Sequence, residues 1–192
     1  MTTVDAGEAL LARADDAVLA LRAYLAGARV AVLEAVTRDG MVDAALIERG
    51  QRAVHGFAWT ATVVEGLAQL LAWARRLARE GRLGAGEATL VEIGFAEYLA
   101  QILGGLPMSQ NEIARPADLG ARAPAAALAA DKAVAAFLDV GPSAHAAQRS
   151  DLAGRLAEGW RPDEGLGDET LDMIRDQFRR FAEERIAPGA HA

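Results

Sequence analysis

A long stripe of apolar residues near the start of the chain constrains the fold most strongly. Between Asp5 and Arg38 the apolar positions recur at spacings of three and four, which is the period of one face of an α-helix. The stripe consists of Leu11, Ala14, Val18, Leu21, Leu25, Ala28, Val32 and Ala35. At a rise of about 1.5 Å per residue this helix is roughly 50 Å long, which is typical of a helical bundle rather than of a connector.

The same period predicts five further helices, and glycines or prolines separate them. We expect them over residues 43–80, 86–103, 124–139, 143–158 and 168–187. Three glycines inside the second segment, Gly50, Gly56 and Gly66, are expected to mark close helix crossings, because each costs about 1 kcal/mol relative to Ala in a helix. Between Pro107 and Pro124 we expect an ordered loop with one turn at Ser109.

Composition and patterning agree on an all-α fold class. The 192 residues include 45 Ala and only 5% aromatic residues, which favours closely packed helices. No alternating run of β-branched residues indicates a strand. Short connections between the first three helices (5–38, 43–80 and 86–103) predict an antiparallel bundle.

A change of composition near residue 160 predicts a domain boundary. The segment GWRPDEGLG, residues 159–167, holds three Gly and one Pro and is typical of a linker. We therefore expect a helical domain over 1–158, a linker over 159–167 and one further amphipathic helix within 168–192. That helix carries Leu171, Ile174, Phe178, Phe181, Ala182 and Ile186 on one face.

The charge balance and residue usage exclude several function classes. The net charge is −7, and the 20 basic residues include only one lysine, Lys132, and form no basic block, so nucleic-acid binding is not expected. Without cysteine the chain has no disulfide, thiolate metal site or cysteine nucleophile. The longest uncharged run has 14 residues, too few for a membrane-spanning helix, and no secretory signal begins the chain. A cytoplasmic protein is expected.

The candidate polar residues favour structural roles over chemistry. None of His55, His145 and His191 follows a glutamate by three residues, so a di-iron site is not expected. His55 and Trp59 lie one helical turn apart and are expected to form a hydrogen-bonded structural pair, with a small polar pocket as the alternative. His145 is expected at a helix start and to be solvated, and His191 lies in the C-terminal tail.

Two further groups of polar residues also favour structural or solvated roles. Ser109 and Glu112 have the spacing of a helix-capping box, with ligand contact as the alternative. Glu92 and Glu97 could form an acid–base pair, but a spacing of five puts them on different helix faces, and solvated roles are expected. The glycine-rich segments lack the lysine of a phosphate-binding loop.

The C-terminal segment DETLDMIRDQFRRFAEERIAPGAHA resembles the opening helix of the acyl-CoA dehydrogenase family, including its exit through Ile186-Ala187-Pro188. Upstream, RAVHGFAWTATVVEGL and EIGFAEYLAQILGGLPMSQNEIARPADLG resemble the N-terminal extension of family members that oxidise methylsuccinyl-CoA. The resemblance covers most of residues 50–192. It departs at Gly189, where a larger residue is expected, and at Ala192, beyond which a dehydrogenase continues for several hundred residues.

This resemblance implies part of a flavoprotein that oxidises an acyl-CoA thioester at Cα–Cβ. In the family, FAD lies between a middle β-domain and a C-terminal helical domain, and the latter supplies the glutamate base. No catalytic, cofactor-binding or metal-binding residue is therefore assigned to this chain, which is expected to be inactive alone. Its partners would be the remaining dehydrogenase domains or a second copy. The alternative is a stand-alone helical module for protein–protein interaction.

Overall fold

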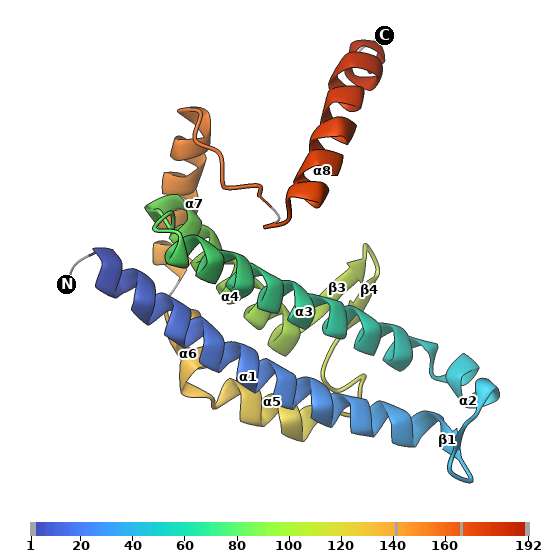
Figure 1. The fold of residues 1–192 in the computed structure, drawn as a ribbon. Helices are drawn as coiled ribbons and strands as arrows, with labels where there is room; N and C mark the ends of the chain where they lie inside the picture. The colour runs from blue at the N-terminus through green and yellow to red at the C-terminus, as the bar shows by residue number, and fades with distance from the viewer. Residues whose placement is uncertain (1–2, 141, 166, 191–192) are drawn as a thin grey trace. The chain divides into compact units, whose positions relative to one another are not determined.

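The computed structural model describes residues 3–140, 142–165 and 167–190, and it is dominated by helices (Figure 1). The chain divides into two compact units, Met1–Trp160 and Arg161–Ala192. In the first unit the helices are α1 (Thr3–Val36), α2 (Ala44–Arg49), α3 (Gln51–Arg79), α4 (Ala85–Gly104), α5 (Arg122–Ala129), α6 (Lys132–Leu138) and α7 (Pro142–Ala157). Two antiparallel strand pairs accompany them: β1 (Thr37–Arg38) with β2 (Met41–Val42), and β3 (Leu106–Ser109) with β4 (Glu112–Ala114).

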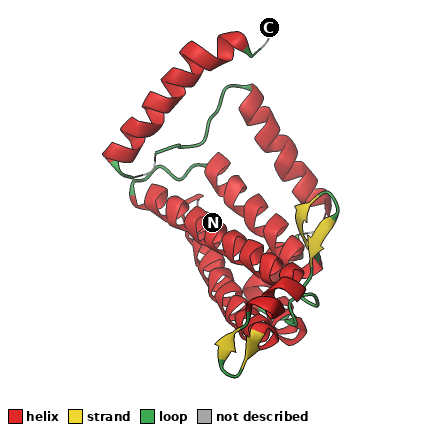
Figure 2. Cartoon of the chain, turned by 90° about the vertical axis from the view of Figure 1, so that its right-hand side faces the viewer, coloured by secondary structure: helices red, strands yellow, loops and turns green. Residues whose placement is uncertain are grey.

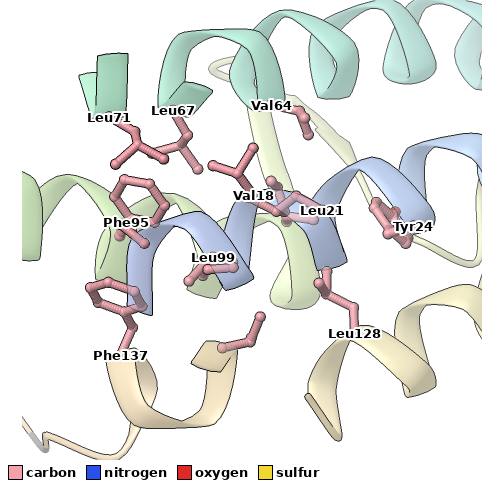
Figure 3. Packing of buried hydrophobic residues seen from close by; sticks show 14 of the residues in the cluster. Val18, Leu21, Tyr24, Val64, Leu67, Leu71, Phe95, Leu99, Leu128 and Phe137 are labelled. Carbon is pink, nitrogen blue, oxygen red and sulfur yellow. The ribbon is translucent and has the colours of Figure 1, made fainter. Parts of the chain in front are cut away.

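The three long helices α1, α3 and α4 form the expected antiparallel bundle (Figure 1). Their inward faces meet in one core, where Leu21, Leu67 and Leu99 are almost completely buried (Figure 3). Helices α5 and α6 pack against α1, and α6 and α7 pack against α4. Phe137 of α6 stacks on Phe95 of α4 with 5.0 Å between ring centroids, which joins the short helices to the same core. The all-α fold class is therefore confirmed.

The prediction of no strands was wrong, because two tight hairpins interrupt the helices (Figure 2). After α1 the backbone turns at Asp39 and Gly40, with φ values of 51° and 78°. Left-handed values at both turn residues are the geometry of a two-residue hairpin, for which Asp-Gly is a preferred sequence. The expected break at Asp39-Gly40 is real, but residues 37 and 38 belong to β1 rather than to the helix.

The second hairpin replaces the loop expected between Pro107 and Pro124. Leu106 of β3 pairs with Ala114 of β4, and both side chains are buried. Ser109 pairs with Glu112 across the hairpin, so these two residues do not cap a helix, and the predicted capping box was wrong. Strands of three and four residues are too short to show an alternating pattern, and Pro107 is compatible with a strand that lies at an edge.

Two helices expected to be continuous are each divided. The segment 43–80 breaks at Gly50 into α2 and α3, and the side chain of Asp43 accepts hydrogen bonds from the first turn of α2. The segment 124–139 breaks before Asp131, whose carboxylate accepts from the backbone N–H groups of Ala133 and Val134. These aspartates supply acceptors for N–H groups that a helix start leaves unpaired. In an alanine-rich sequence, the N-cap residue is the only sign of such a break between two helices.

At the end of the first unit, the ring of Trp160 packs directly against Gly86 near the start of α4. A Cβ atom at position 86 would overlap the indole ring, so the close approach requires glycine there.

The second unit contains α8 (Glu169–Phe181), followed by a π-helical turn, η1 (Ala182–Ile186), and a 3₁₀ turn, η2 (Ala187–Gly189). Asp168 caps α8 by accepting hydrogen bonds from Thr170 and Leu171. The helix expected over 168–187 therefore forms, with its last turns wound differently.

Replacing Gly56 or Gly66 of α3 with alanine is expected to have opposite effects on the stability of the fold. A Cβ at Gly56 would lie 2.8 Å from Cβ of Ala114 in β4, whereas at Gly66 it would meet nothing within 4 Å. Gly66→Ala should stabilise the fold by about 0.5–1 kcal/mol through helix propensity. Gly56→Ala should destabilise it by about 1–3 kcal/mol because β4 must move. Urea unfolding followed by circular dichroism measures both, and equal effects would contradict the close crossing at Gly56.

The buried phenol of Tyr24 predicts a loss of stability at alkaline pH. Tyr24 is 2% exposed, and burial raises its pKa from 10.0 to about 12. Since the folded pKa lies above the unfolded one, this contribution is complete below pH 10 and is lost as the pH rises towards 12. We expect the free energy of unfolding to fall by about 2–3 kcal/mol over that interval. Tyr24→Phe should show a smaller fall in parallel urea titrations, and identical profiles would exclude Tyr24 as the cause.

Candidate functional site

His55 and Trp59 of α3 form the hydrogen bond expected from their spacing. The indole Nε1 of Trp59 donates to Nε2 of His55 over 2.9 Å. A neutral His55 therefore carries its proton on Nδ1, which lies 3.8 Å from the carboxylate of Glu112 in β4. The three side chains connect α3 to the second hairpin at an exposed surface. Their geometry suits attachment of the hairpin to α3.

Glu92 and Glu97 lie on α4 but belong to different contacts, so they form no acid–base pair. Glu97 pairs with Arg149 of α7. Glu92 pairs with Arg13 of α1 at 3.1 Å and accepts a short hydrogen bond from Gln148 of α7. The expectation of a solvated role was wrong for Glu92, because α1 and α7 both bring polar side chains to it.

The Arg13 guanidinium has a second contact that the sequence gives no way to foresee. Its Cζ lies 4.5 Å from the centre of the Phe137 ring, a cation–π arrangement. Arg13, Glu92 and Gln148 thus join α1, α4 and α7 beside the aromatic core. The side chains of Arg13 and Glu92 remain about one third exposed, so the ion pair adds only modest stability. The contacts of this cluster hold the four helices in position.

The other histidines and the long helices were candidates for a metal site and for a membrane span. His145 lies half-buried on α7 rather than fully solvated, and His191 lies outside the described residues. Among the described residues no group of three His, Cys, Asp or Glu side chains could hold a metal ion. No described helix is long and apolar enough to cross a membrane.

The most unusual surface of the chain is the apolar face of α8 and its following turn. Phe178 is 72% exposed, and the other large apolar side chains are about half exposed; they are Leu171, Met173, Ile174, Phe181 and Ile186. Leu171, Ile174, Phe178 and Phe181 follow spacings of three and four, so they share one helix face. We call these four residues and Ile186 the α8 face.

Charged residues on the other side of α8 bind the segment that precedes this helix in the second unit. Arg175 bonds to Asp172 and Asp176 and to the backbone carbonyl of Glu164. Arg179 pairs with the Glu164 side chain. The segment before α8 is therefore attached to its charged side. Full burial of a large apolar side chain contributes about 1.5–3 kcal/mol, so a partner that covered the α8 face would gain several kcal/mol.

Comparison with known proteins supports the family resemblance. No model of a known protein family matches the chain. The chain is 47% identical over 187 residues to the (2S)-methylsuccinyl-CoA dehydrogenase of Cereibacter sphaeroides. The match covers 95% of this chain and 33% of that enzyme, so the chain spans about a third of the relative's length. The resemblance to an acyl-CoA dehydrogenase is confirmed, and it extends over both units.

Removing α8 should leave the bundle intact, because every described member of the buried core cluster lies between Leu10 and Phe137. A chain cut after Gly167 should therefore keep the thermal midpoint of the first unit within a few degrees. Differential scanning calorimetry of the two chains measures this. A midpoint lowered by about ten degrees or more, at roughly 2–4 °C per kcal/mol, would place α8 in the bundle core.

Proposed function

We propose that this chain forms the N-terminal helical part of a FAD-dependent acyl-CoA dehydrogenase that acts on a methylsuccinyl-CoA-like thioester. The observation that carries the proposal is the 47% identity over 95% of the chain. An identity of this extent includes the bundle, the linker and α8 together. Within the bundle it covers residues that build the core as well as exposed ones, so it supports a common structure for the whole segment.

In this proposal the bundle is a supporting domain and α8 is the first helix of the dehydrogenase proper. The α8 face is the surface on which the following helices of the enzyme would pack. Two Phe side chains, Phe178 and Phe181, supply much of that surface, and both are more than half exposed in this chain. The polar attachment of Glu164 to Arg175 and Arg179 leaves the opposite, apolar side available to the rest of the enzyme.

In this proposal the flavin chemistry belongs to the rest of the enzyme. The grooves between its helices have volumes of about 260–360 Å³, at the lower limit for sites that enclose a ligand. Each groove is partly open. These three grooves are too small to enclose FAD, and no step of the oxidation is assigned to the residues that line them. Their proposed contribution is to support the domains that hold the cofactor.

A stand-alone interaction module remains the second candidate, because α1 and α8 both expose large apolar side chains. It would use these faces to bind another protein rather than the remainder of an enzyme. The cytoplasmic location expected from the sequence stays a prediction under either function.

A chimeric enzyme tests the first candidate. This chain would replace the matching third of the Cereibacter sphaeroides dehydrogenase, with the other two thirds unchanged. We expect the chimera to bind flavin and to oxidise (2S)-methylsuccinyl-CoA, while this chain alone stays colourless and inactive. Visible absorbance after gel filtration and a dye-reduction assay measure the two properties.

Two variants of the chimera, a test and its matched control, show whether the α8 face is responsible for the result. Phe178→Asp in the chimera should lower flavin content and activity, because it puts a charge into the surface that the following helices cover. Asp151→Asn, on the exposed surface of α7, should leave both unchanged. A folded but flavin-free chimera, or flavin bound stoichiometrically by this chain alone, would contradict the proposal.

A further inference from the structure

A groove between α1 and α3 gathers three arginines. It has a volume of about 360 Å³ and is lined by Arg22 of α1 and by Arg75 and Arg79 of α3. The same lining includes one acid, Asp15, and its remaining residues are apolar, among them the buried Leu71. We call the groove with these four charged residues the arginine groove. Its lining carries an excess of two positive charges on a chain whose net charge is −7.

The antiparallel arrangement of α1 and α3 brings the three arginines to one groove (Figure 1). Oδ2 of Asp15 lies 3.0 Å from Nη2 of Arg75, so these two residues are level with each other. Arg22 lies two turns after Asp15 on α1, and Arg79 lies one turn after Arg75 on α3. Their backbones are therefore roughly 16 Å apart, on opposite sides of the ion pair. Long side chains of a helix lean towards its N-terminus, so both arginines extend towards the pair.

Only one of the three guanidinium groups is neutralised by an ion pair. Asp15 pairs with Arg75, and the side chains of both are 43% exposed. In the part of the chain that the structure describes, Arg22 and Arg79 have no acidic partner. Two unpaired cations that extend into the same groove repel each other, and a bound anion would replace this repulsion with attraction.

The acids nearest to the arginine groove on α1 and α3 do not cancel its charge. They do not line the groove, and they are Glu8, Asp16, Glu65 and Glu80. Glu65 accepts a hydrogen bond from Gln69 over 2.7 Å, and Glu80 pairs with Arg76. Asp16 lies about 100° around α1 from Asp15, and Glu8 lies two turns closer to the N-terminus. The positive excess is therefore confined to the groove, which favours a small anion over an extended one.

We propose that the arginine groove binds a phosphate group, either as the free ion or as the phosphate of a nucleotide. A phosphate monoester carries about −1.5 to −2 charges at pH 7, which matches the two unpaired arginines. The planar guanidinium donates two parallel hydrogen bonds to phosphate oxygens, so arginine suits this ligand better than lysine does. The groove is partly open, so the remainder of a nucleotide would extend outside it.

Titration of the full chain with inorganic phosphate at low ionic strength, followed by the NMR signals of the arginine Nε–H groups, tests the proposal. Arg22→Gln or Arg79→Gln should each weaken binding about tenfold, because each removes a charge-assisted hydrogen bond. Asp15→Asn should strengthen binding several-fold, because it frees Arg75 and removes a repelling charge. Arg29→Gln is the matched control, since it removes the same charge from the exposed surface of α1 outside the groove, and it should leave binding unchanged.

Two results would overturn the proposal. One is the absence of saturable phosphate binding by the natural chain. The other is equal weakening by Arg22→Gln and Arg29→Gln, which would show a general response to net charge rather than a site.

Titration with AMP distinguishes the two sources of the phosphate group. AMP that binds more tightly than inorganic phosphate, with the same dependence on Arg22 and Arg79, would assign the groove to a nucleotide. Equal or weaker binding of AMP would assign it to the free ion. AMP binding that neither arginine substitution weakens would overturn the proposal, because the ligand would then lie elsewhere.

Discussion

The burial of one face of α1 is the constraint on which the rest of the first unit depends. Its stripe meets α3 along most of its length, and α4, α5 and α6 pack against the same helix. Val18 and Leu21 lie between Leu67 and Leu71 of α3 and Leu99 of α4 in the core (Figure 3). An isolated helix gains little from its own propensity, so this packing is what stabilises a bundle of alanine-rich helices. The hairpins and short helices then occupy the positions that the three long helices leave open.

Polar contacts at the edge of the core decide how the short helices attach. Arg13 of α1 reaches Glu92 of α4 and lies over Phe137 of α6, while Gln148 brings α7 to the same carboxylate. At the second hairpin, formed by β3 and β4, the Arg52 guanidinium donates a hydrogen bond to the carbonyl of Ile113. These contacts join segments far apart in the sequence, and they add orientation more than stability because their side chains stay partly exposed. The first unit thus has one apolar core, and ion pairs and hydrogen bonds at its surface attach the shorter elements to it.

The long helices were predictable from sequence because their apolar period extends over many turns. Leu11, Ala14, Val18, Leu21, Ala28 and Val32 are buried as the stripe requires, and only Ala35 of that stripe is exposed. The hairpins were not predictable, because a period of two cannot be recognised over two to four residues. The helix break before Asp131 was not predictable either. In the sequence, an N-cap aspartate among alanines looks the same as a solvent-exposed aspartate. The role of Glu92 depends on Arg13, which lies 79 positions earlier in the chain, and no local pattern reveals such a partner.

The packing of Trp160 on Gly86 has a consequence for whatever binds α8. Trp160 ends the first unit, and Glu164 is already held by the arginines of α8, so only Arg161, Pro162 and Asp163 join these two anchored points. Both ends of this short linker are therefore ordered by contacts within their own units. A partner that binds the α8 face does not have to order the linker first, so less conformational entropy is lost on binding than with a flexible tail.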